Sequence, residues 1–318
     1  MDTQQCSHTV LMIKPVNFRY NEQTAVNNYY QRVMDDLEPG EVQQKAQKEF
    51  DGLVSKLGER QVNVIVIDDT PAPDTPDSIF PNNWISFHDD GRVGLYPMYA
   101  HNRRLERRDE ILATLENEYH LKISGIEDFS THERHDKFLE GTGSMILDRQ
   151  NKIVYAALSL RTNEEVLDEF CRKFGYKPVK FTANQTVNGK RVPIYHTNVM
   201  MCVAEEFAIL CVDAIDDREE KEKVLSSLES TGKEIIEISE QQKYRFAGNM
   251  LQVKSTAGEK YLVMSESAYK SLTDQQVESI EKHCAIIHSS LDTIEALGGG
   301  SARCMMAEVF LPKKHSLI

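Results

Sequence analysis

Short apolar runs occur in pairs along this chain, and a tight polar turn separates the two runs of each pair. Paired runs of strand-forming residues around Asp, Asn or Gly are typical of β-hairpins. Four stretches have this form: NWISFHDDGRVGLYP (83–97), GSMILDRQNKIVYAAL (143–158), NVMMCVAEEFAILCV (198–212) and NMLQVKSTAGEKYLVMS (249–265). The pattern therefore predicts four hairpins, which begin at Asn83, Gly143, Asn198 and Asn249.

The two ends of the chain provide a fifth pair of apolar runs. The stretch CMMAEVFL (304–311) predicts a strand near the C-terminus, and HTVLMIKPVNF (8–18) predicts one near the N-terminus. We expect the N-terminal strand to pair with the C-terminal one and so close the array of hairpins. By position, this fifth unit begins at Arg303 or Cys304.

A helical pattern and then a short strand follow the hairpins. Apolar residues at helical spacing in charged stretches predict helices within 102–120, 162–176, 214–235 and 273–284. The second of these begins with a Thr162–Asn163 cap and ends at Gly175. Short strands are predicted within 62–69, 122–126, 177–183, 234–239 and 285–290.

The repeated unit is therefore a hairpin, a helix and a strand, at intervals of roughly 50 to 60 residues. Five copies with a closing N-terminal strand predict an α/β ring that closes as propellers do. The alternative is a two-domain α/β protein with a crevice at the switch point of its sheet, since 318 residues suffice for about two domains.

Composition and charge limit the classes of partner. The formal net charge of −13 argues against nucleic acid and against an anionic membrane surface, because both need a basic face. No apolar run approaches the length of a membrane span, and the N-terminus does not have the form of a signal peptide. A cytoplasmic location is expected, in which the six cysteines are free thiols.

Four short motifs stand immediately before or at the start of the predicted hairpins. They are PDSIFPNNW (76–84), FLEGTGS (138–144), YHTN (195–198) and GGGSARC (298–304). In a ring of such units the inner strands start at one mouth, and loops at strand ends are where function concentrates. The repeat therefore predicts that these four distant motifs meet.

Cys304 is the candidate nucleophile. A thiolate is strongly nucleophilic, especially beside a cation, and Arg303 is adjacent, although a strand would direct it to the opposite face. The preceding glycines allow backbone to approach a ligand closely. The alternative is a buried cysteine in a core strand, which Met305 and Met306 favour.

His196 is the candidate general acid and base, because the pKa of histidine lies near neutral. Glu140 could orient a histidine or accept from cationic or amide N–H donors. Each also has a structural interpretation, as a histidine satisfied within the fold and as a solvated turn acid. Arg161 could hold a carboxylate with two hydrogen bonds. Arg103 or Arg104, near a helix start in a run that is otherwise a solvated face, could also reach inward.

These motifs, in this order, resemble the guanidino-group-modifying superfamily, the penteins. It includes arginine deiminase, dimethylarginine dimethylaminohydrolase, agmatine deiminase and the amidinotransferases. The resemblance covers nearly the whole chain and is closest to amidinotransferase-like proteins of the citrulline-utilisation type. It implies a five-bladed α/β propeller of ββαβ repeats around a central channel, with residues 1–318 as one domain of five pseudo-repeats.

The resemblance also implies functional positions. Cys304 matches the family nucleophile, His196 the general acid and base, and Glu140 the acidic residue of an E-G-G-D-like motif. Arg161 matches an arginine that binds the substrate carboxylate. The implied substrate-binding positions are, in full, Asp77, Asn82, Asn83, Arg103, Arg104, Arg161 and Asn198.

This chain is neutral at three places where arginine deiminase is charged. Asn82 and Asn83 stand where the family has an acidic residue, Asn198 ends the histidine motif, and Gly143 replaces the final Asp of the glutamate motif. A buried guanidinium needs carboxylate partners, whereas amides offer the donors and acceptors that suit a ureido group. The sequence therefore indicates a citrulline-like ureido substrate as strongly as it indicates arginine or an N-substituted arginine.

The expected activity is hydrolysis of a C–N bond through a covalent Cys304 adduct, with a small guanidino or ureido amino acid as the partner. No cofactor is expected, and no residues have zinc-like spacing. An amidinotransferase would use the same intermediate. A non-catalytic binding protein of this fold is the alternative from another class. An NAD-binding enzyme is disfavoured because no GxGxxG follows a strand.

Overall fold

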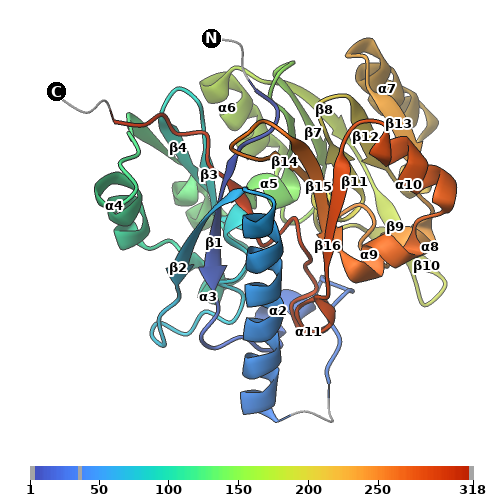
Figure 1. Ribbon diagram of the computed structural model, residues 1–318. Coiled ribbons are helices and arrows are strands. Elements are labelled where there is room, and N and C mark those ends of the chain that lie inside the picture. Colours follow the sequence, from blue (N-terminus) through green and yellow to red (C-terminus); the bar gives the residue numbers. More distant parts are fainter. Residues whose placement is uncertain (1–3, 35–37, 315–318) are drawn as a thin grey trace.

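The computed structural model describes residues 4–34 and 38–314, and most of its strands form five three-stranded sheets (Figure 1). Each sheet has an antiparallel pair followed by a parallel third strand. The sheets are β17–β1–β2 (Ala307–Glu308, Thr9–Lys14, Asn63–Asp68), β3–β4–β5 (Ile85–Phe87, Arg92–Leu95, Gly125–Asp128), β6–β7–β8 (Ile146–Asp148, Ile153–Ala157, Lys177–Phe181), β11–β12–β13 (Met201–Val203, Phe207–Leu210, Glu234–Glu237) and β14–β15–β16 (Leu251–Lys254, Lys260–Ser265, Ala285–Ser289).

A helix joins the second and third strands of each sheet, which makes each unit a ββαβ repeat. These connections contain α2 (Pro39–Glu59), α3 (His101–Arg104) with α4 (Asp109–Asn117), α6 (Glu164–Phe174), α7 (Arg218–Ser230), and α9 (Glu266–Ser271) with α10 (Asp274–Glu281). Other helices are α1 (Glu22–Ala25), α5 (Gly141–Ser144), α8 (Glu240–Lys243) and α11 (Asp292–Gly298). The predicted repeat of hairpin, helix and strand is confirmed.

The five sheets form the predicted ring. Strand β11 contacts β6 and β14, and β17 contacts β3, so the first strands of neighbouring repeats meet around the centre. The ring closes as expected, because β1 from the N-terminus pairs antiparallel with β17, with Val10 opposite Glu308. The fold is thus the expected α/β propeller, and the alternative of an open sheet with a switch-point crevice is wrong. That residues 1–318 form one domain stays a prediction.

Helix α6 shows how local sequence specifies these repeats. Asn163 caps its start by accepting hydrogen bonds from the backbone of Glu165 and Val166, and Gly175 ends it in the left-handed conformation (φ 73°). One apolar stripe is buried against the sheet: Val166, Leu167, Phe170, Cys171 and Phe174. Burial of each large apolar side chain contributes about 1.5–3 kcal/mol.

Three local expectations need correction. The helix expected within 102–120 is broken into α3 and α4, because Arg107 and Arg108 between them bond to Tyr96 O, Glu133 and Asp68 O instead of continuing one solvated face. A separate hairpin, β9 (Asn184–Val187) and β10 (Lys190–Pro193), was not predicted. The residues expected to begin the inner strands lie in turns or one-turn helices ahead of them.

No helix in the described part of the chain combines the length and apolar character needed to cross a membrane.

Candidate active site

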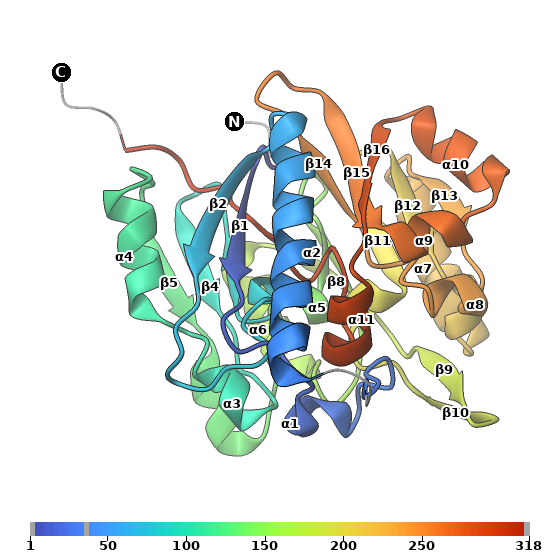
Figure 2. The ribbon, with the colours of Figure 1, turned by 60° about the horizontal axis from the view of Figure 1, so that its bottom comes forward.

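The short segments that precede the inner strands gather at one end of the ring. They include η1 (Pro81–Asn83), α5 and η3 (Thr197–Val199), and α5 contacts both of the others. Residues 21–32, hereafter the N-terminal segment, lie against α11 on the same side (Figure 2). Together they enclose a pocket lined by Thr24, Asn28, Asp77, Phe80, Asn83, Arg103, Arg161, Tyr195, His196, Gly298–Gly300 and Cys304.

Cys304 lies at the wall of this pocket and is 3% exposed. Two side-chain amides donate to its sulfur: Asn198 Nδ2 at 3.3 Å and Asn249 Nδ2 at 3.2 Å. Asn249 Oδ1 in turn accepts from the backbone N of Arg303 at 3.0 Å. This bond connects the turn that contains Cys304 to the start of β14. The sulfur therefore has a defined position and is contacted by neutral donors.

The surroundings of Cys304 differ from the expectation of a strand. Cys304 lies in a turn, its backbone N bonded to Ser301 O at 2.9 Å, and β17 begins three residues later. The Arg303 guanidinium turns away and bonds to Met306 O and Glu308. Arg303 is therefore not the cation beside the thiol.

The glycines before Cys304 also need a different interpretation. A side chain at Gly298 or Gly300 would meet the Phe80 ring at 2.7 or 3.0 Å, and Gly299 has φ +61°. Gly299 O accepts from the Tyr195 hydroxyl at 2.7 Å. These glycines line the pocket, but close packing on Phe80 and the left-handed turn require them directly.

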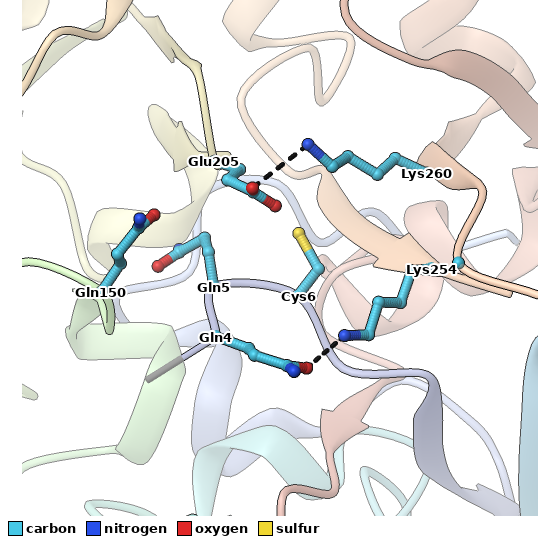
Figure 3. A pocket seen from close by; sticks show the side chains of 8 residues that line it. Gln4, Gln5, Cys6, Gln150, Glu205, Lys254 and Lys260 are labelled. Carbon is cyan, nitrogen blue, oxygen red and sulfur yellow. Dashed lines mark hydrogen bonds and ion pairs between the residues drawn. The ribbon is translucent and has the colours of Figure 1, made fainter. Parts of the chain in front are cut away.

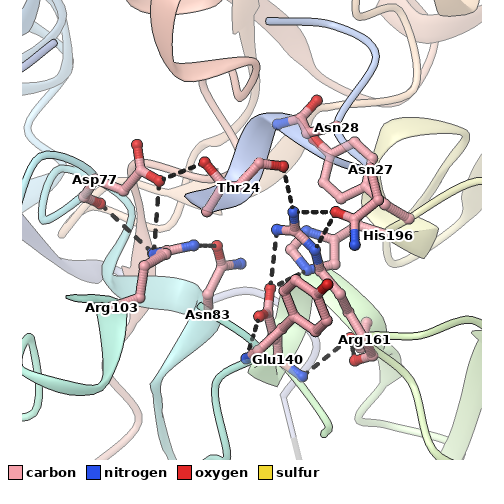
Figure 4. A network of polar contacts seen from close by, with 12 residues as sticks. Thr24, Asn27, Asn28, Asp77, Asn83, Arg103, Glu140, Arg161 and His196 are labelled. Carbon is pink, nitrogen blue, oxygen red and sulfur yellow. Dashed lines mark hydrogen bonds and ion pairs between the residues drawn. The ribbon is translucent and has the colours of Figure 1, made fainter. Parts of the chain in front are cut away.

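His196 and Glu140 form a fully buried pair beside the pocket (Figure 4). His196 Nε2 lies 2.7 Å from Glu140 Oε2, and Glu140 Oε1 accepts from the backbone N of Tyr99 at 2.9 Å. An ionised carboxylate only accepts, so Nε2 carries the imidazole proton. The other ring nitrogen, Nδ1, is left as the proton acceptor, and it faces Gly143.

Burial and neighbouring charges shift the pKa values of His196 and Glu140 in opposite directions. Burial lowers the pKa of His196 to about 4, although the hydrogen bond and charge of Glu140 raise it. For Glu140 burial would raise the pKa, but the charge of Arg161 and the bond to His196 lower it well below its usual range. The pair is therefore a neutral imidazole held by an ionised carboxylate.

Arg161 lies between the dyad and the N-terminal segment. Its Nη1 is 3.4 Å from Glu140 Oε2, its Nη2 donates to Thr24 O at 2.8 Å, and its Nε donates to Asn27 Oδ1 at 3.0 Å. The guanidinium also lies over the Tyr195 ring, 5.0 Å from its centroid. The guanidinium reaches the pocket as expected, and its N–H groups already donate to Glu140, Thr24 and Asn27.

Arg103 is the one of the two candidate arginines that reaches the pocket. It is buried, pairs with Glu106 through Nε and Nη2, both at 2.9 Å, and donates from Nη1 to Asn83 Oδ1 at 2.7 Å. Arg104 instead bonds to Met98 O and lies near Glu133, outside the pocket lining. The orientation of Asn83 is thereby set by a cation.

Among the residues that the structure describes, two acceptors at the site have no hydrogen-bond partner. Asp77 Oδ2 accepts from Asn21 at 2.7 Å and Thr24 at 3.1 Å, but its buried Oδ1 has no hydrogen bond. Asn198 Oδ1, on the amide that contacts the Cys304 sulfur, is also buried and unsatisfied. Buried polar atoms without partners are costly, so each is a place where a ligand N–H would be stabilised.

Four predicted site residues do not line the pocket itself, namely Arg104, Glu140, Asn198 and Asn82. Glu140 and Asn198 contact residues that line it, whereas Asn82 lies behind Asn83. The Asn82 side chain bonds to Thr142 Oγ1 at 3.3 Å and accepts from Asn83 Nδ2 at 3.0 Å. Sequence reasoning also missed residues that do take part, namely Asn249 and the N-terminal segment. Asn249 was detectable, since it occupies the same repeat position as Asn83 and Asn198, whereas NEQTAVNNYYQR (21–32) has no periodic pattern.

Gly143 leaves no room for a side chain beside His196, and we expect Gly143→Ala to lower kcat/KM by about 100-fold. An added Cβ would come within 2.8 Å of His196 Nδ1 and would also clash with Asn83 Nδ2. Steady-state kinetics on the folded variant measures the effect. Gly40→Ala is the matched control, because its Cβ meets no atom within 4 Å. Equal activity of the two variants would contradict this arrangement.

Larger cavities lie away from this site. One of about 360 Å³ is lined by Gln4, Gln5, Cys6, Gln150, Glu205, Lys254, Gly258 and Lys260 (Figure 3). Lys260 is already paired with Glu205 at 3.2 Å, and Lys254 donates to Gln4. Burial raises the pKa of the Cys6 thiol well above its usual range, which disfavours the nucleophilic thiolate there.

All six cysteines are free and buried. Burial also raises the pKa of four thiols elsewhere in the chain: those of Cys171, Cys202, Cys211 and Cys284.

Within residues 4–34 and 38–314, no group of three or more His, Cys, Asp or Glu side chains is arranged to hold a metal ion.

Solved structures share this fold. The N-terminal domain of ArgZ, an arginine dihydrolase from the ornithine–ammonia cycle in Cyanobacteria, matches with a TM-score of 0.71 and 17% identity over 95% of this chain and 99% of that one. AgrE, solved with ornithine and NAD+, matches with a TM-score of 0.70 and 17% identity over 97% of this chain and 40% of that one. A dimethylarginine dimethylaminohydrolase adduct with S-methyl-L-thiocitrulline matches with a TM-score of 0.62 and 14% identity, over 95% of this chain and 99% of that one.

Among curated proteins no significant sequence match is found. The family model described as N,N dimethylarginine dimethylhydrolase, eukaryotic, matches residues 14–311, which is most of the chain. The propeller of ββαβ repeats and the order of the motifs agree with that match. This chain therefore belongs to the eukaryotic N,N dimethylarginine dimethylhydrolase family, within the pentein superfamily.

Proposed function

We propose that this protein is a cysteine-dependent hydrolase that cleaves a C–N bond of a guanidino or ureido amino acid. The observation that carries the proposal is the meeting of three groups at one enclosed pocket. The Cys304 sulfur is held by two amides, and a His196 imidazole is held by the Glu140 carboxylate. A positioned thiol with a positioned base is the arrangement that covalent catalysis requires.

In the first step His196 Nδ1 takes the thiol proton, and the Cys304 thiolate attacks the planar carbon of the substrate. A C–S bond forms and one C–N bond breaks, and the departing nitrogen receives the proton from the His196 imidazolium. Glu140 remains ionised and stabilises that imidazolium. We expect Asn198 Oδ1, which has no hydrogen-bond partner among the described residues and belongs to the amide that contacts the Cys304 sulfur, to accept an N–H of the reacting group.

In the second step His196 takes a proton from water, and the resulting hydroxide attacks the carbon bound to sulfur. The C–S bond breaks, and the thiolate recovers a proton from the imidazolium. Water completes a hydrolysis, whereas an amine acceptor in its place would complete an amidino transfer. No side chain described around the sulfur distinguishes an amine acceptor, so hydrolysis is the simpler assignment.

The rest of the amino acid has complementary groups in the pocket. The Arg161 guanidinium provides a site for the substrate carboxylate. The carboxylate would displace Asn27 Oδ1 and the Thr24 carbonyl oxygen, which accept from Arg161 in this structure. The unpartnered Oδ1 of Asp77 would accept from the α-ammonium group. Asp77 is a second carboxylate in the pocket, but its contacts are with Asn21, Thr24 and Arg103 and not with Cys304.

The groups that touch the reacting end favour a ureido substrate. Asn198 and Asn249 contact the sulfur, both as neutral amides, and the Glu140 oxygens are already occupied by His196, Tyr99 N and Arg161. A guanidinium at the sulfur would find the Glu140 oxygens occupied, and the free Oδ1 of Asp77 is the oxygen that we assign to the α-ammonium group, so its charge would stay unpaired, which is expensive. We therefore expect turnover of a citrulline-like ureido acid to exceed that of arginine.

The lowered pKa of His196 predicts an unusual pH profile. With a pKa of about 4, the imidazole is neutral at pH values where an ordinary histidine, with a pKa of 6.5, is already protonated. Below its pKa it cannot accept the thiol proton, so kcat/KM should stay level down to about pH 5 and then fall about tenfold per pH unit below about 4. Rates measured with circular dichroism at each pH test this. A midpoint near the ordinary value, in folded protein, would contradict it.

The function itself is tested by a substrate panel. The protein is incubated with arginine, methylated arginines, agmatine, citrulline and related ureido acids, with and without an acceptor amine. Ammonia and amine release are followed by mass spectrometry, with Cys304→Ser as the control. Release without transfer to the acceptor supports a hydrolase, and transfer supports an amidinotransferase. If no compound turns over and none forms an adduct on Cys304, the protein is a non-catalytic member of its family.

A further inference from the structure

The pocket is narrow in this structure, and the N-terminal segment forms one of its walls. Its volume is about 10 Å³, which holds about one water molecule. An amino acid can enter only if a wall moves. The N-terminal segment contains one turn of helix, and its outer face is exposed, with Val26 62% and Tyr29 43% exposed. This short helical turn and exposed outer face make the N-terminal segment the wall that we expect to move.

This segment is held partly by contacts to the site itself and partly by bonds from Gln31 and Arg32 to backbone oxygens of α11. Asn21 and Thr24 bond to Asp77, and Asn27 bonds to Arg161. Substrate carboxylate and ammonium groups would compete for these partners. A further anchor outside the pocket, which substrate does not displace, would therefore help to keep the segment closed when substrate is bound.

Tyr30 provides that anchor in an aromatic cluster outside the pocket. Its ring packs on Phe246 at 5.1 Å, on Tyr244 at 5.7 Å and edge-on to Tyr195 at 6.1 Å between centroids. Tyr195 in turn lines the pocket and lies 4.6 Å from the His196 ring. The cluster connects the N-terminal segment with the dyad.

Lys243, at the end of α8, lies beneath this cluster and is fully buried. Its Nζ donates to the Tyr30 hydroxyl at 3.0 Å and to Gln185 Oε1 at 3.1 Å. It also lies 3.8 Å from the centroid of the Tyr244 ring. Among the described residues no carboxylate forms an ion pair with this ammonium, so Tyr30 is one of its few compensating partners.

A buried ammonium without a carboxylate is expensive to keep, and burial lowers the pKa of Lys243 to about 8. The cost falls when the Tyr30 oxygen and the aromatic faces are in place. Opening of the N-terminal segment would remove Tyr30 and leave the ammonium with Gln185 and Tyr244. The cation therefore favours the closed position of the segment.

We propose that Lys243 is a positioning residue for the reaction, and that its bond to Tyr30 holds the N-terminal segment closed over the substrate. It touches neither the substrate nor the catalytic groups. Its kinetic consequence rests on the proposed function. Its structural consequence, the closure of residues 21–32, does not.

The test replaces Lys243 with methionine, which keeps the length of the side chain and removes its charge and donors. Hydrogen exchange of peptides that cover residues 21–32 is expected to become about tenfold faster, which corresponds to about 1.4 kcal/mol. With an active substrate, KM is expected to rise about tenfold while kcat changes less than about twofold, because Cys304, His196 and Glu140 are unaltered. Tyr30→Phe should reproduce part of both effects, and adding it to Lys243→Met should have little further effect.

Lys233→Met is the matched control, since Lys233 is also buried but bonds to Glu205 O and lies near Asp148, away from the segment. It is expected to lower stability without a specific change at residues 21–32. Exchange at residues 21–32 that is the same in Lys243→Met as in Lys233→Met would overturn the proposal. If no substrate turns over, exchange alone decides about Lys243, and only the proposed function fails.

Discussion

Cys304→Ser is expected to lower kcat by about 10⁴-fold or more, because serine has no ionisable thiol to form the C–S bond. The substitution changes little else at the site. Asn198 and Asn249, which donate to the sulfur, can donate to a hydroxyl oxygen in the same place. Substrate affinity, measured by calorimetry, should therefore change only a few-fold, and no adduct should appear in the intact mass.

Cys171→Ser is the control for this variant. Cys171 is also a buried, free thiol, but it packs in α6 away from the pocket. It is expected to retain activity in proportion to its folded fraction. A Cys304→Ser protein with more than about a tenth of the wild-type kcat would exclude Cys304 as the nucleophile.

Glu140→Gln is expected to lower kcat by about 10² to 10⁴-fold and to lower the free energy of unfolding by about 3 kcal/mol. The carboxylate holds the proton on His196 Nε2 and lies within 3.4 Å of Arg161. A glutamine loses the charge that stabilises the imidazolium and leaves the Arg161 cation poorly compensated. Kinetics and chemical denaturation measure the two effects.

Asp148→Asn separates the two effects of Glu140→Gln. Asp148 is a fully buried acid that lies 3.5 Å from Lys233 and bonds to Asn151, outside the pocket lining. Its loss should lower stability by a comparable amount but leave kcat of the folded protein near wild type. If Glu140→Gln behaves in the same way, then Glu140 is structural and the dyad has no role in catalysis.

The neutral positions that distinguish this chain have unequal roles in the structure. Asn198 contacts the Cys304 sulfur, and Asn83 is fixed by Arg103 at the pocket wall. Asn82 lies behind them, bonded to Thr142 and Asn83. Gly143 leaves the space that the His196 ring and the Asn83 amide occupy. The neutral end of the pocket that we propose for a ureido group therefore depends on Asn198 and Asn249 more than on the Asn82–Asn83 pair.

The repeat architecture was predictable because its signals are local. Alternating apolar runs, tight turns, the Asn163 cap and the left-handed Gly175 each depend on a few neighbouring residues. The same local signals placed four motifs at the starts of the repeats and so at one end of the ring. They failed where side chains with distant partners decide the backbone, as in the break between α3 and α4.

Patterns along the sequence therefore sufficed to predict the repeated hairpin, helix and strand, the closure by the N-terminal strand and the convergence of the motifs that contain Cys304, His196 and Glu140, although α2 was not predicted. Only the tertiary structure decided which polar atoms meet. It selected Arg103 over Arg104, turned Arg303 away from the thiol, and placed Asn249 on it. The physical reason is that local patterns encode the type and burial of an element. The direction of a side chain across a pocket depends instead on packing between different segments of the fold, as between Asn249 and Cys304.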